Sequence, residues 1–347
     1  MSGGRGSIWV VLTRLPDGGV QLSVRPPLIY LDHCAVRKIS SDSAMRAHFR
    51  ETFATRGTLM FSVMNMIEMA QNSGPSYERV RDLLNDAGPC WLPSDPDPAT
   101  AHERERRGIL APAAFLPPIE LIVELFRASP AGTFDLGAAL DRLHDNEFRS
   151  RAPELLHRSG RSEILTMLAA NRRRHEAGEK LPPLRLPPRS IPWIEASLAR
   201  LLVKDHKRIT ENDINDLFHA VVPLRYAIIV VLDKAWASYA KRLKLEDGTQ
   251  IFAASERGLV GALDCMRNID VSAHGRSCRR AADRSPGVAG STISVVARSD
   301  RKPLPSRRTA PLVYNARPLG RNGSTLASPG WTPTRARSCS VNWPRTR

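Results

Sequence analysis

The chain has 347 residues, of which 42% are hydrophobic, and a formal net charge of +16 at pH 7. That hydrophobic content is enough for a sizeable core and excludes a chain that is disordered throughout. The charge is uneven, because residues 271–347 hold 14 Arg and one Lys against two Asp, a net +13, which leaves +3 for residues 1–270. The basicity therefore does not by itself indicate a nucleic-acid-binding surface on the folded part.

The five cysteines are odd in number, widely spaced and without a CxxC pair. This pattern argues against a disulfide framework and against a zinc site, and it fits a reducing cytoplasm. Ile8–Leu12 is far shorter than the apolar region of a secretory signal, and no run approaches the roughly 20 apolar residues of a membrane span. We expect a soluble cytoplasmic protein.

Residues 1–27 contain two β-prone runs around the turn-forming segment Pro16–Gly19. They predict an N-terminal extension that forms a hairpin. The next segment, Leu28–Leu31, is a short apolar run that leads directly into Asp32. It predicts a buried strand with a carboxylate at its end.

A helix is expected to begin at Ser41 or Ser43 and to end before Gly57. Thr58–Ser62 then predicts a second strand, and Val63–Ala70 predicts a helix rich in Met. Strand, helix, strand and helix in succession imply parallel strands joined by right-handed crossovers. The fold class is therefore α/β.

Between residues 99 and 193 the pattern is helical and broken by prolines, which predicts a helical insertion or cap on the sheet. The other expected elements are helices at 76–87, 191–203, 213–222, 234–243 and 256–266, and strands at 90–93, 226–232 and 249–253. We place the whole folded domain at residues 28–270.

Residues 271–347 are dominated by Arg, Ser, Pro and Gly, although fragments such as Ile293–Val296 are β-prone. Such a composition buries too little apolar area to offset the entropy of ordering, so a disordered tail is expected. The abrupt change of composition near residue 270 favours an unstructured or out-of-frame extension, and an Arg-rich RNA-binding tail is the functional alternative.

Five acidic side chains stand out because they follow apolar strands or lie on helices close to them in sequence: Asp32, Glu68, Asp213, Asp216 and Asp233. Asp32 and Asp233 each end an apolar run, and open α/β sheets keep their ligand sites at the carboxyl ends of strands. Asp213 and Asp216 are three residues apart, so they share a helix face. Glu68 lies on an otherwise apolar helix, where an unpaired carboxylate would cost several kcal/mol.

Helix capping explains part of this pattern. Asn212 is a suitable N-cap and a first helical turn favours negative charge, so capping explains Asp213 equally well. A single Asp at a strand end is also more often a cap than a ligand. Two of them on parallel strands, with Glu68 and Asp216, reverse that preference and predict a carboxylate cluster that binds Mg²⁺ or Mn²⁺.

The acids stand in short motifs: Ile29-Tyr30-Leu31-Asp32, Ser62-x-x-Asn65-x-x-Glu68, Asn212-Asp213-x-x-Asp216-x-x-His219, and Pro223-x-x-Tyr226 leading to Leu232-Asp233-Lys234-x-Trp236. Their succession resembles the PIN-domain nucleases, a superfamily that includes the toxin ribonucleases of bacterial toxin–antitoxin pairs. The resemblance covers residues 28–265, with 99–193 as an insertion relative to a minimal member.

The resemblance implies a three-layer α/β/α sandwich with a parallel sheet and a metal-dependent endoribonuclease site. Asp32, Glu68, Asp216 and Asp233 would be the catalytic acids that bind Mg²⁺ or Mn²⁺, and Asp213 would be an accessory metal ligand. The substrate would be RNA, cleaved to a 5′-phosphate and a 3′-hydroxyl. A protein antitoxin and a homo-oligomer are left open as partners. We expect His33 and His219 to pack or to support the acids.

Two alternatives remain open. Larger relatives carry an Asp two residues after the motif Tyr, where this chain has Ile228, so a PIN-like module that has lost catalysis and binds nucleic acid or protein is the runner-up. In a third interpretation, the chain is a helical interaction protein in which residues 99–203 matter and the acids are caps. The distances between the acids in the folded chain separate these hypotheses.

Overall fold

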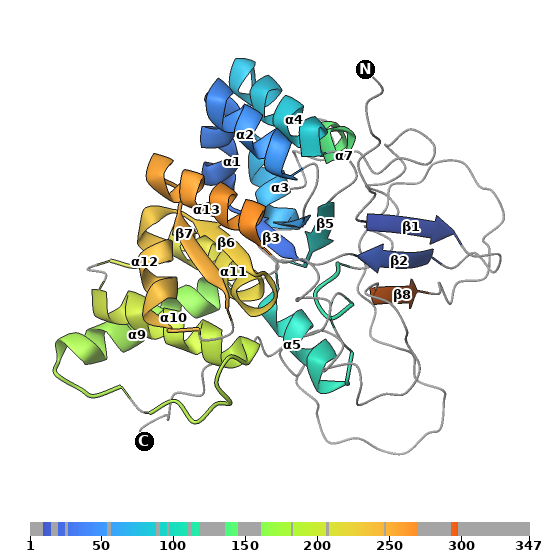
Figure 1. Cartoon of the computed structure of the whole chain (residues 1–347). Coiled ribbons are helices and arrows are strands. Elements are labelled where there is room, and N and C mark those ends of the chain that lie inside the picture. The colour runs from blue at the N-terminus through green and yellow to red at the C-terminus, as the bar shows by residue number, and fades with distance from the viewer. Residues whose placement is uncertain are drawn as a thin grey trace, which may run out of the picture.

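A five-stranded parallel sheet lies at the centre of the chain in the computed structural model (Figure 1). The sheet fits the α/β fold expected from the strand and helix pattern. The structure describes residues 10–14, 20–24, 27–53, 57–87, 91–95, 97–109, 111, 113–117, 136–144, 161–181, 183–205, 208–245, 248–269 and 293–297.

The strands of this sheet are short and almost wholly apolar, as is usual for parallel strands covered on both faces. They are β3 (Leu28–Leu31), β4 (Thr58–Ser62), β5 (Trp91–Ser94), β6 (Ile229–Leu232) and β7 (Gln250–Ala253). Their order is β5-β4-β3-β6-β7, which is 3-2-1-4-5 in chain order. Ile29 in the central strand pairs with Leu59 on one side and Ile229 on the other. The direction of winding reverses between β3 and β6, where open sheets of this kind bind ligands.

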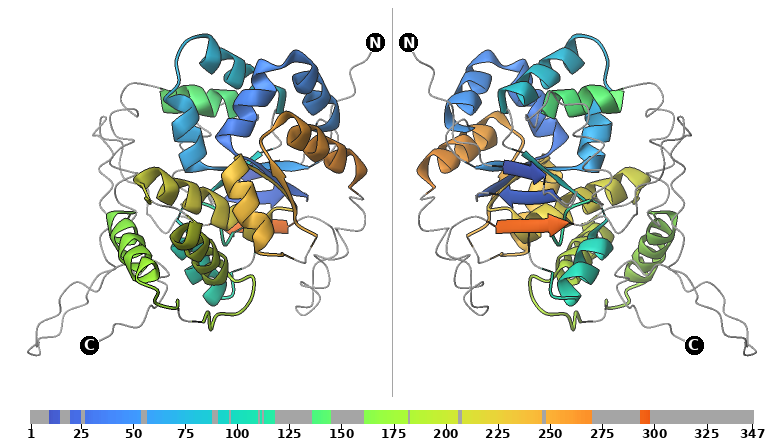
Figure 2. Two further views of the ribbon diagram at one scale, coloured as in Figure 1. Left: turned by 90° about the vertical axis from the view of Figure 1, so that its left-hand side faces the viewer. Right: turned by 90° about the vertical axis from the view of Figure 1, so that its right-hand side faces the viewer.

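Helices cover both faces of the sheet, which makes three layers (Figure 2). One face carries α1 (His33–Ser41), α2 (Ser43–Phe53), α3 (Val63–Ala70), α4 (Pro75–Ala87), α7 (Leu136–His144) and α13 (Glu256–Asn268). The other carries α5 (Pro98–Arg106), α9 (Arg161–Glu176), α10 (Ile191–Asp205), α11 (Glu211–Tyr226) and α12 (Lys234–Arg242). Among the described residues, no helix is long and apolar enough to cross a membrane.

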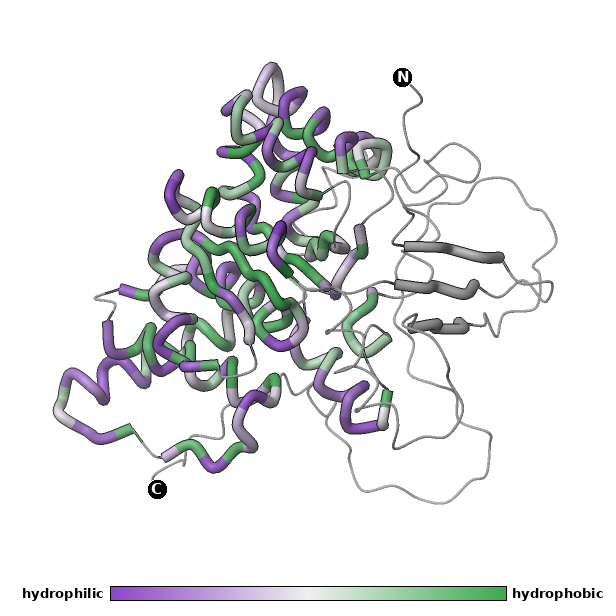
Figure 3. The backbone as a smooth tube through the Cα atoms, viewed as in Figure 1, coloured by the Kyte–Doolittle hydropathy of each residue, from purple (hydrophilic) through white to green (hydrophobic). Residues whose placement is uncertain are grey.

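Alternation along β3 divides the core between the two faces. Ile29 and Leu31 belong to the cluster under α1 and α4, whereas Tyr30 between them belongs to the cluster under α10 and α11. Successive side chains of a strand point to opposite faces, so one strand serves both layers. Apolar residues are concentrated in the central strands (Figure 3).

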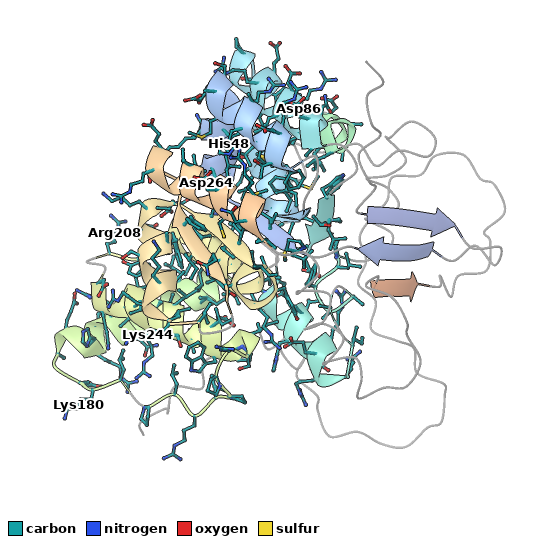
Figure 4. All side chains as sticks on the ribbon, in the orientation of Figure 1. His48, Asp86, Lys180, Arg208, Lys244 and Asp264 are labelled. Atoms are coloured by element: carbon teal, nitrogen blue, oxygen red, sulfur yellow. The ribbon has the colours of Figure 1, made fainter. Side chains whose placement is uncertain are left out.

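Polar contacts join helices at the surface of these layers. His48 on α2 faces Asp264 on α13, with His48 Nε2 3.7 Å from Asp264 Oδ1 (Figure 4). On the opposite side of the sheet, the labelled cations Lys180, Arg208 and Lys244 are exposed around α9, α10 and α12 (Figure 4). These cations lie at the outer surface of the second helical layer.

Two helix boundaries differ from the sequence-based expectation. A helix was expected only from Ser41 or Ser43, but α1 already begins at His33 because Asp32 caps it. A strand was expected from Tyr226, but α11 continues to that residue in spite of Pro223. The ring of Tyr226 packs against Phe115 with centroids 4.7 Å apart. This tertiary contact holds the last helical turn in place.

A second sheet lies outside the domain that we assigned to residues 28–270. It contains β1 (Val10–Arg14), β2 (Val20–Val24) and β8 (Ile293–Ala297), in the antiparallel order β1-β2-β8. Leu22 of the central strand pairs with Leu12 and with Val295. Apart from β8, the segment 271–347 for which disorder was predicted lies outside the described residues.

Candidate functional site

Asp32 and Asp233 occupy equivalent positions at the ends of neighbouring strands. Asp32 follows β3 and accepts a hydrogen bond from the backbone N–H of His33 at 2.7 Å, as the N-cap of α1. Asp233 follows β6, and its Oδ1 accepts from the N–H of Trp236 at 2.8 Å, as the N-cap of α12. Because β3 and β6 flank the point where the winding reverses, both caps also stand at the carboxyl-edge crevice.

A third acid reaches this crevice from α11. Asp216 is half-buried, and its Oδ2 accepts a hydrogen bond from the indole Nε1–H of Trp236 at 3.2 Å. A small, shallow pocket lies here, lined by Asp32, Asp216, His219, Leu232, Asp233 and Trp236. Three acids that are far apart in the sequence therefore border one pocket.

Glu68, on α3, joins the same group through two histidines. Its Oε1 lies 3.3 Å from Nε2 of His219, which also lines the pocket. Its Oε2 lies 3.2 Å from Nδ1 of His33, and that nitrogen is 3.4 Å from Oδ1 of Asp32. The two imidazoles thus connect Glu68 with the acids at the ends of the strands.

The carboxylates influence one another electrostatically. Burial raises the pKa of Asp216 to about 7, although His219 opposes the rise. The negative charges of Asp32, Asp233 and Glu68 are smaller contributions to this raised pKa. Such an effect requires the four acids to be near one another in space.

The histidines act in the opposite direction. Burial alone would raise the pKa of Glu68, but hydrogen bonds with His219 and His33 bring it below its usual value. Burial would also raise the pKa of Asp32, but the hydrogen bond from His33 and the charge of His219 outweigh it, so this pKa is lowered. Hydrogen bonds to Asp32 and Glu68 raise the pKa of His33 to about 10. Imidazoles therefore balance part of the negative charge.

Asp213 is used differently from the other acids. Its Oδ2 accepts hydrogen bonds from the backbone N–H of Thr210 at 2.7 Å and from the Thr210 hydroxyl at 2.8 Å. These contacts form a capping box at the start of α11, with Thr210 as the N-cap in place of the expected Asn212. Asp213 does not line the pocket, so the structure places it in the helix cap.

Ile228 lies at the opposite end of the sheet from the acids. Its N–H donates to the carbonyl of Leu28, at the beginning of β3, and its carbonyl accepts from the N–H of Gln250. Asp233 lies five positions further along the chain, which is about 16 Å along a strand. An Asp at this position would lie remote from the pocket.

The residues present suit a divalent cation in donor type and in charge. Carboxylate oxygens are the ligands that Mg²⁺ and Mn²⁺ prefer. The pKa of Asp216 is raised mainly by burial and secondly by repulsion from the other acids, and a bound cation would relieve that repulsion. As the side chains stand, no group of three or more His, Cys, Asp or Glu in the described ranges has the arrangement of a metal site. Asp32 and Glu68 are instead directed at His33, and Asp233 at a helix N–H.

The sequence pointed only weakly to the two histidines. His219 lies three residues after Asp216, which places both on one face of α11, and His33 directly follows Asp32. The expectation that they would pack or support the acids did not include their contacts with Glu68. Those contacts join residues up to 151 positions apart, which no local pattern reports.

Comparison of the chain with protein-family models, with curated proteins and with solved structures found no match in any of the three.

Proposed function

We propose that the protein is a metal-dependent ribonuclease of the PIN-domain type. The observation that carries the proposal is the convergence of Asp32, Asp216 and Asp233 on one pocket at the carboxyl edge of a parallel sheet. Hydrolytic sites of this kind need clustered carboxylates that hold divalent cations against a phosphate. The succession of acids that resembles the PIN-domain nucleases supports the same reaction.

Each residue has a definite part in this proposal. Asp32, Asp216 and Asp233 would hold Mg²⁺ or Mn²⁺, and Glu68 would complete the set from the adjacent helix. The bound cation supplies a water of lowered pKa and offsets charge on the phosphate. Trp236 keeps Asp216 turned into the pocket through its indole N–H.

The substrate class is supported by the resemblance, and the charge distribution agrees with it. The net +13 of residues 271–347 favours a polyanion such as single-stranded RNA. A protein antitoxin and a homo-oligomer remain predictions of the resemblance alone.

The test is cleavage of single-stranded RNA in the presence of Mn²⁺ or Mg²⁺. Cleavage should fall by about 100-fold or more in Asp32→Asn and Asp216→Asn proteins, since cation-bound charge stabilisation is worth several kcal/mol. Asp264→Asn is the matched control, because this acid lies on α13 and contacts His48 outside the pocket. Undiminished cleavage in both folded variants would reject the proposal.

The second candidate is a non-catalytic PIN-like module that binds RNA or protein without hydrolysing it. It is favoured by the finding that the described acids do not stand in a ready metal arrangement. Thermal unfolding with increasing Mn²⁺ distinguishes the two. A metal-binding site should stabilise the folded chain by about 2.7 kcal/mol at 100 times its dissociation constant, and a degenerate site should give no shift.

A further inference from the structure

A chain of buried hydrogen bonds leads from the interior of the sheet to Glu68. The Asn65 amide donates to the Tyr30 hydroxyl at 2.7 Å, and the Ser62 hydroxyl donates to Asn65 Oδ1 at 2.9 Å. Ser62 Oγ also lies 3.0 Å from Nδ1 of His219. The opposite nitrogen of that ring faces Glu68. The other four members of this chain, Tyr30, Asn65, Ser62 and His219, are each at most 5% exposed. Water therefore does not compete for these contacts.

The array of Ser62, His219 and Glu68 has the residue types of a nucleophilic triad, but its geometry is unsuited to that use. Ser62 is 3% exposed, its hydroxyl proton is donated to Asn65, and it does not line the pocket. An activated serine needs its oxygen open to substrate and its proton directed at the base. The accessible end of the array is Glu68, which is 23% exposed in its side chain.

The buried contacts determine how the imidazole of His219 is turned. Because Nδ1 is held at Ser62, Nε2 is directed at the Glu68 carboxylate, 3.3 Å away. A half-turn of the ring would leave buried polar atoms without partners, which is unfavourable. The orientation of His219 is thus set from the side remote from the pocket.

We propose that His219 is a positioning residue that holds Glu68 ready for cation binding, and that Ser62 acts through it. This inference rests on the proposed metal-dependent function. Residues that hydrogen-bond to metal-binding side chains orient them, and their loss commonly costs about 10- to 100-fold in metal affinity. Ser62 reaches Glu68 by two routes, through the ring of His219 and through the cap of α3, the helix that carries Glu68.

The test is a Mn²⁺ titration of the full chain, followed by electron paramagnetic resonance and by thermal unfolding. Ser62→Ala and His219→Leu should each weaken Mn²⁺ binding by about 10- to 100-fold. The double variant should bind no more weakly than His219→Leu alone, because two residues acting in one chain are not additive. With RNA as substrate, kcat should fall while KM stays unchanged.

Ser94 provides a matched control for Ser62. It pairs with Ser62 in register on the adjacent strand β5, it is fully buried, and its hydroxyl has no hydrogen-bond partner within the described part of the chain. Ser94→Ala removes the same atom from a neighbouring position. It should leave Mn²⁺ affinity unchanged.

Ser62 also caps α3 by accepting from the N–H of Asn65, so Ser62→Ala will lower the melting temperature as well. Ser62→Thr is the conservative variant, because it retains both the cap and the hydroxyl. Threonine should restore Mn²⁺ affinity along with stability. A purely structural role would lower the melting temperature without changing the affinity of the folded protein.

The outcomes distinguish the positioning role of His219 from the metal-dependent function on which it rests. Wild-type protein that binds Mn²⁺, with Ser62→Ala and His219→Leu binding equally well, overturns the positioning role and leaves the metal site standing. Additive losses in the double variant overturn the role assigned to Ser62. Wild-type protein that shows no Mn²⁺ signal in either measurement overturns the metal-dependent function itself, and the role of His219 with it.

Discussion

At the scale of single residues, Asp32 shows how one carboxylate serves two purposes. It caps α1 and it borders the pocket, and both follow from its place directly after a buried strand. Capping and ligand binding are therefore not competing explanations here, although the sequence presented them as such. The same holds for Asp233, whereas Asp213 has the capping role without a place at the pocket.

A buried acid outside the pocket makes stability depend on pH. Glu195 on α10 is 6% exposed, and its Oε2 has no hydrogen-bond partner among the described residues. Burial raises the pKa of Glu195 from 4.5 to about 8, and the charge of Asp97 contributes. An acid whose pKa is raised by folding favours the folded state below pH 4.5, and this contribution is lost as the pH rises through 8.

The free energy of unfolding of the wild-type chain should therefore fall between pH 5 and pH 8, and Glu195→Gln should remove this fall. At about 1.4 kcal/mol per pH unit the fall amounts to several kcal/mol in the wild-type chain. Urea unfolding at a series of pH values measures it. Glu78→Gln, at an exposed position on α4, is the control and should follow the wild-type curve. Parallel curves for Glu195→Gln and wild type would contradict the prediction.

At the scale of elements, α11 shows how local and distant requirements are combined in one helix. Its first turn is stabilised by the Thr210–Asp213 box, and over the next two turns Asp216 and then His219 face the pocket. The cap determines where the helix begins, and the 3.6-residue repeat then determines which side chains reach the sheet edge.

Asp213→Ala and Asp216→Ala should separate these two duties. Loss of the capping box in Asp213→Ala should cost about 1 kcal/mol of stability and leave Mn²⁺ affinity unaltered. Thr210→Ala should do the same. Asp216→Ala should abolish Mn²⁺ stabilisation. Calorimetric titration with Mn²⁺ and urea unfolding of the three proteins measure these effects. Weakened Mn²⁺ binding in Asp213→Ala would contradict the prediction and would indicate that Asp213 is a metal ligand.

At the scale of the whole molecule, charge and candidate site lie in different parts of the chain. The acids lie between residues 32 and 233, where the chain is nearly neutral, whereas residues 271–347 carry +13. Within the latter segment the structure describes β8, which pairs with β2 in the second sheet. Polyanion attraction and cation binding should accordingly be separable.

A chain shortened to end at residue 270 should retain the Mn²⁺ affinity of the full chain and bind single-stranded RNA more weakly. The salt dependence of RNA binding should also become shallower, because fewer counterions are released when fewer basic residues contact phosphate. Fluorescence anisotropy at several salt concentrations measures both changes. An unchanged slope would show that the basic segment does not contact the RNA.

The sequence by itself determined the parallel α/β character and the positions of Asp32 and Asp233, because apolar runs that end in Asp identify buried strands and their ends without reference to any partner. It also placed Asp216 and Asp213 on one helix. Boundaries were less predictable: α1 begins before any expected start, because one Asp both ends β3 and caps the helix.

Only the tertiary structure decided which acids meet. In the folded chain Asp213 belongs to a helix cap, and Ile228 lies at the opposite end of the sheet from the acids. His219 contacts both Ser62 and Glu68. The physical reason is that local periodicity is set by neighbouring residues, whereas burial and hydrogen bonding between strands and helices depend on contacts across more than a hundred residues. Such contacts exist only after the layers have packed.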